Sequence, residues 1–150
     1  MALFDGTEEH PPSKVRRYII TGLTFVILVV LGCWYLLRFH QETTSVKNFL
    51  NTVASGNFDL AYQMWKPAPS FSFKDFMEDW GPNSYYGPVK SYSILKAKSP
   101  TGSTTSVEVR IAISPYSPMP TANNDPEKSQ KTKVVNVWVD TKDKSFSFPP

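Results

Sequence analysis

The stretch DFMEDWGPNSYYGPV holds acids and tyrosines, which are residue types that proton-transfer chemistry uses. Asp75 and Asp79 are spaced one helical turn apart, and Tyr85 and Tyr86 follow within a few residues. A carboxylate base and a tyrosine donor in an apolar cavity could move a proton on a small molecule. The same spacing also predicts a helix with a water-facing acidic side, in which Asp75 caps the first turn. We favour the second interpretation and assign no catalytic residue.

Other catalytic and metal chemistry finds little support. The two histidines, His10 and His40, flank an apolar segment, and they cannot converge if that segment spans a membrane. Without a histidine in the remaining chain, no Ser-His-Asp or Cys-His set is available. Neither a glycine-rich phosphate loop nor a zinc or calcium motif is present in the sequence. We therefore expect no enzyme activity, no metal and no cofactor.

Residues 18–37, YIITGLTFVILVVLGCWYLL, are apolar and uncharged over twenty positions. At about 1.5 Å per residue such a helix extends roughly 30 Å, the thickness of the hydrocarbon core of a bilayer. Aromatic residues stand at both ends, as in an interfacial belt. We predict a transmembrane helix over residues 18–39, preceded by a cytoplasmic tail at 1–17.

Basic residues predict the orientation of this helix. Lys14, Arg16 and Arg17 precede it, whereas Arg38 is the only close basic residue after it. The excess favours a cytoplasmic N-terminus and a translocated C-terminal domain. An alternative is a lipoprotein signal, because Val30 to Cys33 resembles a lipobox and Cys33 would then carry a lipid. The apolar run continues beyond this cysteine, which favours an uncleaved anchor.

The chain after the anchor has the composition of a single neutral domain. Residues 41–150 carry twelve Lys and Arg against ten Asp and Glu, so a nucleic-acid partner is not expected. Cys33 is the only cysteine, which leaves the domain without disulfides. About 110 residues are enough for a hydrophobic core to hold the domain together.

Three short amphipathic helices are predicted first. Val46, Phe49, Leu50 and Val53 follow the helical period after possible caps at 43–45, and Gly56-Asn57 ends this helix. A second helix covers 58–65 and stops at Lys66-Pro67, and a third covers 73–80, from the Ser72 capping box to Gly81-Pro82.

Strands follow the helices. The period changes to two over residues 89–98, 104–114 and 133–140, with a short last strand at 145–148 and a turn at 99–103. One apolar face of an antiparallel sheet needs helices packed against it. The fold class is therefore α+β: an N-terminal transmembrane helix, then about three short helices packed on an antiparallel sheet of three to four strands, within a domain over 44–148.

Residues 114–131 form a proline-rich connection that is long for a hairpin, and we expect part of it to contact a partner. Aromatic residues outside the helical periodicity are the best candidates for such contact. The candidate binding surface or pocket rim comprises Trp80, Asn83, Tyr85, Tyr86, Tyr116, Met119 and Trp138.

The run VKNFLNTVASGNFDLAYQMW, residues 46–65, resembles the opening helices of the nuclear-transport-factor-2-like superfamily. Together with the strands, the resemblance covers about residues 44–148. It is similar in particular to small single-span bacterial proteins with a D-F-x-x-D-W-G-P segment. The resemblance implies a curved sheet wrapped around the helices as a cone, and a bacterial inner membrane location. The loop at 114–131 is longer than such a cone needs.

Members of this superfamily include ketosteroid isomerase-like enzymes and many non-catalytic modules, so fold does not determine function. We expect a membrane-anchored, non-enzymatic binding or accessory module with a membrane-protein partner, as in a small subunit of a respiratory or photosynthetic complex. The alternative is a small-molecule-binding or isomerase-like pocket lined by Trp80, Tyr85 and Tyr86; its ligand is unknown.

Overall fold

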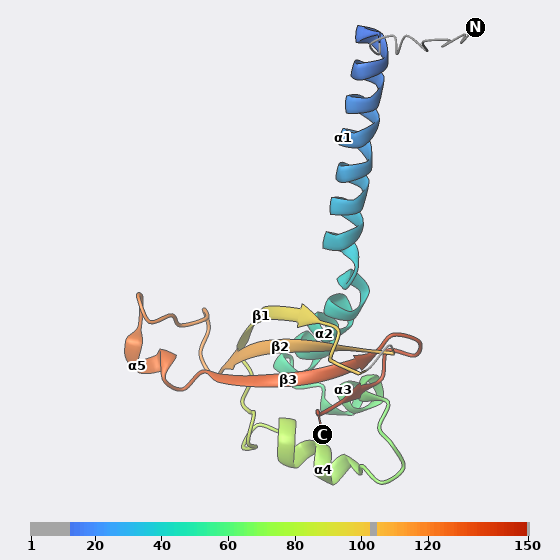
Figure 1. Ribbon diagram of the computed structural model, residues 1–150. Helices are drawn as coiled ribbons and strands as arrows, with labels where there is room; N and C mark the ends of the chain where they lie inside the picture. Colours follow the sequence, from blue (N-terminus) through green and yellow to red (C-terminus); the bar gives the residue numbers. More distant parts are fainter. Residues whose placement is uncertain (1–12, 103–104, 150) are drawn as a thin grey trace, which may run out of the picture. The chain divides into compact units, whose positions relative to one another are not determined.

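The computed structural model describes residues 13–102 and 105–149 (Figure 1), and the chain divides into two compact units after Arg38. The first unit consists of α1 (Lys14–Leu37), where the Ser13 hydroxyl oxygen accepts a hydrogen bond from the Arg16 backbone N–H. This helix is long and apolar enough to cross a membrane. Most of the predicted tail at 1–17 lies outside the described residues.

The second unit begins with α2 (His40–Ala54), which starts earlier than the predicted caps at 43–45. Those caps were wrong because the hydroxyls of Thr43 and Ser45 donate to carbonyls one turn back, at Phe39 and Gln41. This is how such residues behave inside a helix rather than at its start. After α2 the chain turns at Gly56, whose φ of 79° suits glycine, and this position confirms the predicted helix end.

Two short helices follow as predicted. In α3 (Phe58–Trp65) the Asn57 side chain caps the first turn, accepting from the Leu60 N–H. In α4 (Phe73–Trp80) the predicted capping box is present: Ser72 accepts from the Asp75 N–H, and the Asp75 carboxylate accepts from the Ser72 N–H. Each helix is eight residues long, so packing and caps must stabilise it.

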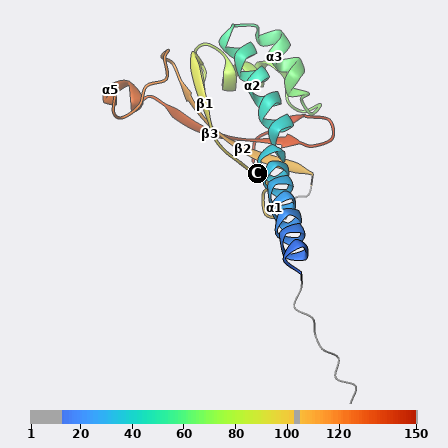
Figure 2. The same ribbon diagram turned by 90° about the horizontal axis from the view of Figure 1, so that it is seen from above.

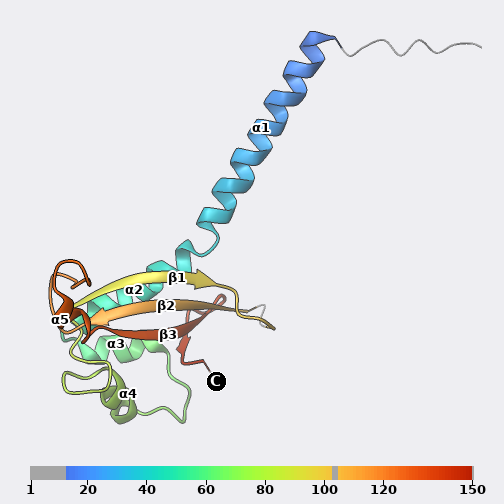
Figure 3. The same ribbon diagram turned by 60° about the vertical axis from the view of Figure 1, so that its left-hand side comes forward.

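Within the described residues, four antiparallel strands complete the domain in the order β1-β2-β3-β4, and Figure 3 shows β1, β2 and β3 side by side. They are β1 (Ser91–Lys98), β2 (Ser106–Ser114), β3 (Lys133–Asp140) and β4 (Phe146–Ser147). Each strand pairs with its neighbour in sequence. Residue 103 of the predicted turn and residue 104 of the predicted second strand lie outside the described residues. The α+β fold class and the antiparallel sheet are confirmed.

The core lies between the helices and one face of the sheet. Alternate residues of β2 and β3 turn inward, and all of them are buried. Aromatic rings of α2, α3 and α4 meet this face, as with Phe49, whose ring lies 5.2 Å from the Trp65 ring and 5.2 Å from the Phe146 ring. The inward strand residues are Val107, Val109, Ile111, Ile113, Val135, Val137 and Val139. The opposite face of the sheet is not covered by α2, α3 or α4 (Figure 3).

The long β2–β3 connection contains one further helical turn, α5 (Pro126–Ser129), at the far end of the sheet from α3 (Figures 1 and 2). Local hydrogen bonds fix it. The Asn124 side chain accepts from the Thr121 N–H and hydroxyl, and the Asp125 carboxylate caps α5 by accepting from the Lys128 N–H.

Candidate binding surface at the open edge of the sheet

Trp80 ends α4 and lies wholly in the core. Its ring centroid is 5.1 Å from that of Phe49, 5.8 Å from that of Trp65 and 5.1 Å from that of Tyr86. Its indole Nε1 is buried and has no hydrogen-bond partner among the described residues. Trp80 therefore supports the candidate surface from beneath, and the space around it is filled by other rings.

Asn83 to Tyr86 form a tight loop between α4 and β1. The Ser84 hydroxyl lies 2.7 Å from the Asp79 carbonyl and 2.6 Å from the Gly81 carbonyl, and it accepts from the Gly87 N–H. A Cβ atom on Gly87 would lie 1.8 Å from the Gly81 carbonyl oxygen, so only glycine permits this close approach. The loop is therefore held in one conformation.

This loop presents two tyrosines in different ways. Tyr85 is 66% exposed, and Asn83 is also exposed. Tyr86 is half-buried, with its ring 5.7 Å from that of Phe148. The ammonium of Lys133, at the start of β3, lies 4.5 Å from the centre of the Tyr85 ring and donates to the Tyr85 carbonyl. The loop is thus attached to the first residue of β3.

The electrostatics of this region come from burial and from like charges. Burial raises the pKa of Asp79, and the neighbouring Asp75 and Glu78 carboxylates raise it further. Burial also raises the pKa of the Tyr86 phenol, with a smaller contribution from Asp79. Both effects favour the neutral form of each group. The phenol of Tyr86 is therefore a hydrogen-bond donor at neutral pH.

A hollow of about 500 Å³ opens beside this loop. One side consists of Tyr86, Phe148 and Pro149, and the other consists of residues from β2 and β3. We call it the edge groove. Its lining residues are Tyr86, Arg110, Val134, Val135, Asn136, Phe148 and Pro149.

The edge groove lies where β3 lacks a partner strand. Pairing between β3 and β4 stops at Trp138–Ser147. The Asp140 N–H bonds to the Ser145 carbonyl on the β4 side. Because successive residues of a strand alternate in the direction of their backbone groups, Asn136 and Val134 also direct theirs away from β2. Pro149 would be the next partner of Asn136, and it has no N–H to donate.

The other predicted residues lie elsewhere. Trp138 is on the uncovered face of the sheet, paired with Glu108 on β2 and Ser147 on β4, and its buried Nε1 also has no hydrogen-bond partner among the described residues. Tyr116 and Met119 lie in the β2–β3 connection, fixed to β1 through the Ser91 hydroxyl, which donates to the Tyr116 carbonyl at 2.5 Å. The structure thus brings Tyr86 to the edge groove, and the Tyr85 ring lies 4.8 Å from the Tyr86 ring without lining the groove. Tyr116, Met119 and Trp138 lie outside the groove.

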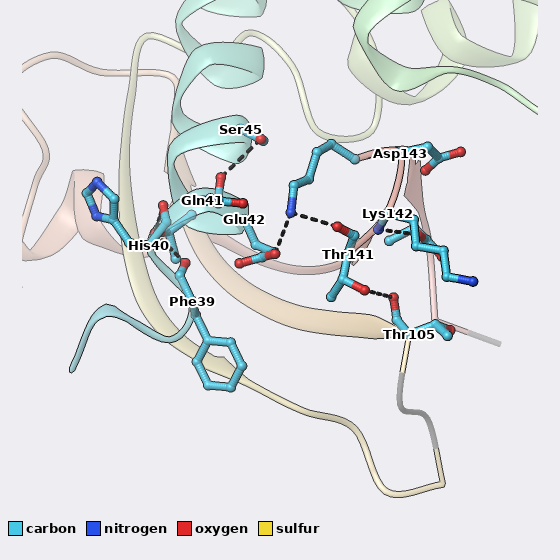
Figure 4. A network of polar contacts seen from close by, with 12 residues as sticks. Phe39, His40, Gln41, Glu42, Ser45, Thr105, Thr141, Lys142 and Asp143 are labelled. Atoms are coloured by element: carbon cyan, nitrogen blue, oxygen red, sulfur yellow. Dashed lines mark hydrogen bonds and ion pairs between the residues drawn. The ribbon is translucent and has the colours of Figure 1, made fainter. Parts of the chain in front are cut away.

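Sequence reasoning missed one contact altogether. The carboxylate of Glu42, on the first turn of α2, is buried and lies 2.6 Å from the Lys144 ammonium in the β3–β4 turn (Figure 4). The same ammonium donates to the Thr141 carbonyl at 2.9 Å. The two residues are 102 positions apart, and neither belongs to a motif, so nothing in the sequence could have paired them.

In residues 13–102 and 105–149, no group of three His, Cys, Asp or Glu side chains is placed to hold a metal ion. Cys33, the candidate lipid attachment site, is an exposed free thiol on α1. Comparison with known proteins adds no family: no family model, no curated protein and no solved structure matches this chain.

Proposed function

We propose that this protein is a single-pass, membrane-anchored, non-enzymatic binding module, and that its domain binds an extended segment of a membrane-protein partner along the open edge of β3. The observation that carries the proposal is the edge of β3 at Val134 and Asn136, which pairs with no other strand among the described residues and lies beside the edge groove. An exposed strand edge is a template for pairing with another chain.

The anchor part of the proposal is supported by α1. Its described side chains are exposed and almost all apolar, which is unfavourable in water and suits a bilayer. The Thr24 hydroxyl donates to the Ile20 carbonyl at 2.9 Å, so this polar group is satisfied within the helix. Basic residues in the first turn of α1, Lys14, Arg16 and Arg17, precede the apolar run and favour an N-terminus in the cytoplasm and a periplasmic or extracellular domain.

The partner part is supported by the chemistry of the edge groove. Backbone groups of Val134 and Asn136 supply hydrogen bonds to an added strand, and the exposed side chain of Val134 supplies apolar contact. The rings of Tyr86 and Phe148 can receive an alternate side chain of that strand. We favour a role as an accessory subunit of a bacterial membrane complex, built on a nuclear-transport-factor-2-like fold.

A small-molecule or isomerase-like site is the second candidate. One observation favours it: Asp79 and Tyr86, an acid and a phenol with raised pKa values, interact next to the edge groove. Against it, Trp80 is packed among rings, so such a ligand would have to bind in the open groove.

Photo-cross-linking in native membranes tests the proposed partner site. A photoreactive residue at Pro149, on the groove, should give one major adduct with another membrane protein. Val134→Pro, which removes an outward N–H, should reduce that adduct about tenfold, whereas Val134→Thr should retain it. A photoreactive residue at Lys47, exposed on α2, is the background control.

Equal adduct yields for Val134→Pro and Val134→Thr would reject the β3 edge as the binding site. An adduct no stronger than the Lys47 control would reject it as well. Unchanged thermal unfolding of Val134→Pro shows that loss of the adduct is not loss of the fold.

A further inference from the structure

Basic side chains form a row across the uncovered face of the sheet. Lys96 on β1 pairs with Arg110 on β2, and Arg110 pairs with Asn136 on β3. In the next row, Lys98 pairs with Glu108. These five residues line a hollow of about 220 Å³, which we call the cationic hollow.

A β-bulge creates this row. The register of β1 and β2 shifts between Ile94 and Lys96, so that Leu95 is left unpaired. Without the shift, Leu95 would stand opposite Arg110, and Lys96 would turn to the core face. Bulges commonly re-aim side chains at functional sites. Here the bulge places a second cation directly across from the first.

The charges in the cationic hollow are not balanced. The Lys98 ammonium lies 3.2 Å from the Glu108 carboxylate, and these two charges compensate each other. The Lys96 ammonium and the Arg110 guanidinium make no ion pair or hydrogen bond within the part of the chain that the structure describes. Like charges directly opposite on neighbouring strands destabilise a sheet. An anion between them would remove this repulsion.

We infer that the cationic hollow binds a phosphomonoester group. Two uncompensated positive charges match the charge of a phosphomonoester, about −1.5 to −2 at neutral pH, better than a carboxylate with its single charge. The Arg110 guanidinium offers paired N–H donors for two phosphate oxygens. Lys96 and the Asn136 amide lie on either side of it in the same row and can donate to the remaining oxygen.

This site adjoins the proposed partner edge, because Arg110 and Asn136 line both hollows. Lys96 lines the cationic hollow and not the edge groove. If Lys96→Gln weakens phosphate binding but leaves cross-linking at the β3 edge normal, the result supports the phosphate site and does not test the partner site. The phosphomonoester is carried by a free molecule or by a lipid such as phosphatidic acid, since both present the same group.

Titration of the full-length protein in dodecyl maltoside micelles with inorganic phosphate, at constant ionic strength, tests the inference by NMR. The backbone amides of Lys96, Arg110 and Asn136 should shift and saturate at millimolar phosphate. Lys96→Gln and Arg110→Gln should each weaken binding about tenfold or more. Lys74→Gln, on the exposed side of α4, should leave it unchanged.

Two controls make the result decisive. Chloride at the same ionic strength should cause no saturable shift. In nanodiscs with 10% phosphatidic acid, a loss of the response to inorganic phosphate would identify a lipid source, and a retained response would identify a free phosphomonoester. No saturable shift with wild-type protein in micelles, or equal affinity in Lys96→Gln and wild type, would overturn the inference.

Discussion

Trp80 shows what a single side chain contributes to this domain. It contacts rings from α2, α3 and the Tyr86 loop and has no exposed surface. We expect Trp80→Ala to lower the free energy of unfolding by about 3–5 kcal/mol, because a large cavity would remain. Urea denaturation of the detergent-solubilised protein measures this change.

Tyr85→Ala is the matched control for Trp80→Ala, since Tyr85 is 66% exposed. Its effect should stay within about 1 kcal/mol. A similar loss for both variants would show that Trp80 does not lie in the core.

The Glu42–Lys144 pair predicts an asymmetric response. Lys144→Asn leaves the buried Glu42 carboxylate without its cation and should cost about 2 kcal/mol or more of unfolding free energy. Asparagine is chosen because Lys144 has a φ of 59°, which asparagine tolerates. Glu42→Gln should cost less, because the Lys144 ammonium is partly exposed and can turn to water.

The exposed neighbour Lys142 supplies the control for this pair, because its ammonium has no ion pair among the described residues. Lys142→Asn should change the unfolding free energy by less than about 0.5 kcal/mol. A larger cost for Glu42→Gln than for Lys144→Asn would contradict the asymmetry.

Asp79 gives a pH-dependent prediction. Its pKa is raised above the ordinary 3.8, first by burial, so the folded state binds this proton more tightly than the unfolded state does. The ionised carboxylate therefore destabilises the fold at neutral pH, and the penalty disappears as pH falls through the raised pKa toward the ordinary value. Asp79→Asn should raise stability at pH 7 but not at pH 3, as measured by thermal unfolding.

At the scale of residues, buried side chains were easier to predict from the sequence than the residues of a surface site. The helical period of Val46, Phe49 and Leu50 predicted burial, because amphipathic spacing reports directly on packing. Trp80 ends the predicted helix at 73–80 and still entered the candidate list for its neighbours in the chain. Arg110 and Lys96 were not singled out, since the shifted register that aligns them is decided by strand pairing.

At the scale of elements, the capping box of α4 is a feature that the sequence predicted and the structure contains. Ser72→Ala removes the hydroxyl that accepts from the Asp75 N–H, and we expect a loss of about 1 kcal/mol of unfolding free energy. The Ser72 N–H and hydroxyl lower the pKa of Asp75, so the substitution should also shift the Asp75 titration to higher pH. Carboxyl NMR detects this shift, and an unchanged titration would contradict the box.

How closely the end of a helix could be predicted depends on what determines that end. Ends defined by a local motif, such as Gly56 or Gly81, were predicted closely because a backbone conformation decides them. The start of α2 was missed because Phe39 precedes it without a side-chain cap. No residue type marks the separation of α1 from α2.

At the scale of the whole molecule, α1 makes the anchor testable. The full-length protein should remain in the membrane fraction after alkaline extraction. Val26→Lys with Val29→Lys places two charges near the centre of α1, at about 2.5–3.5 kcal/mol each, and should release the protein. Retention of this double variant would argue that α1 is not the anchor.

Topology is a separate whole-molecule prediction. In a Cys33→Ser background, Ser55→Cys should react with a membrane-impermeant maleimide on intact cells, since Ser55 is exposed at the end of α2. Ser13→Cys, before α1, should react only after permeabilisation. The reverse pattern would place the domain in the cytoplasm.

The architecture was predictable as α+β because helical and strand periods occupy separate halves of the domain. The open β3 edge was not, although Pro149 was visible in the sequence. Its effect depends on the β3–β4 register, whose continuation beyond the Trp138–Ser147 pair would bring Pro149 opposite Asn136. Register follows from turn geometry and packing together, so it is known only when the chain has folded.

The contact between Glu42 and Lys144 also bears on biosynthesis. Glu42 is made early, but its buried position has no neutralising cation until residue 144 has been made. Strand pairs between neighbours in sequence can form as the chain emerges, whereas this contact joins the first and last turns of the domain. A chain that ends before Lys144 could bury Glu42 only as an uncompensated carboxylate, which destabilises the fold, so incomplete copies should be preferred targets of proteolytic quality control.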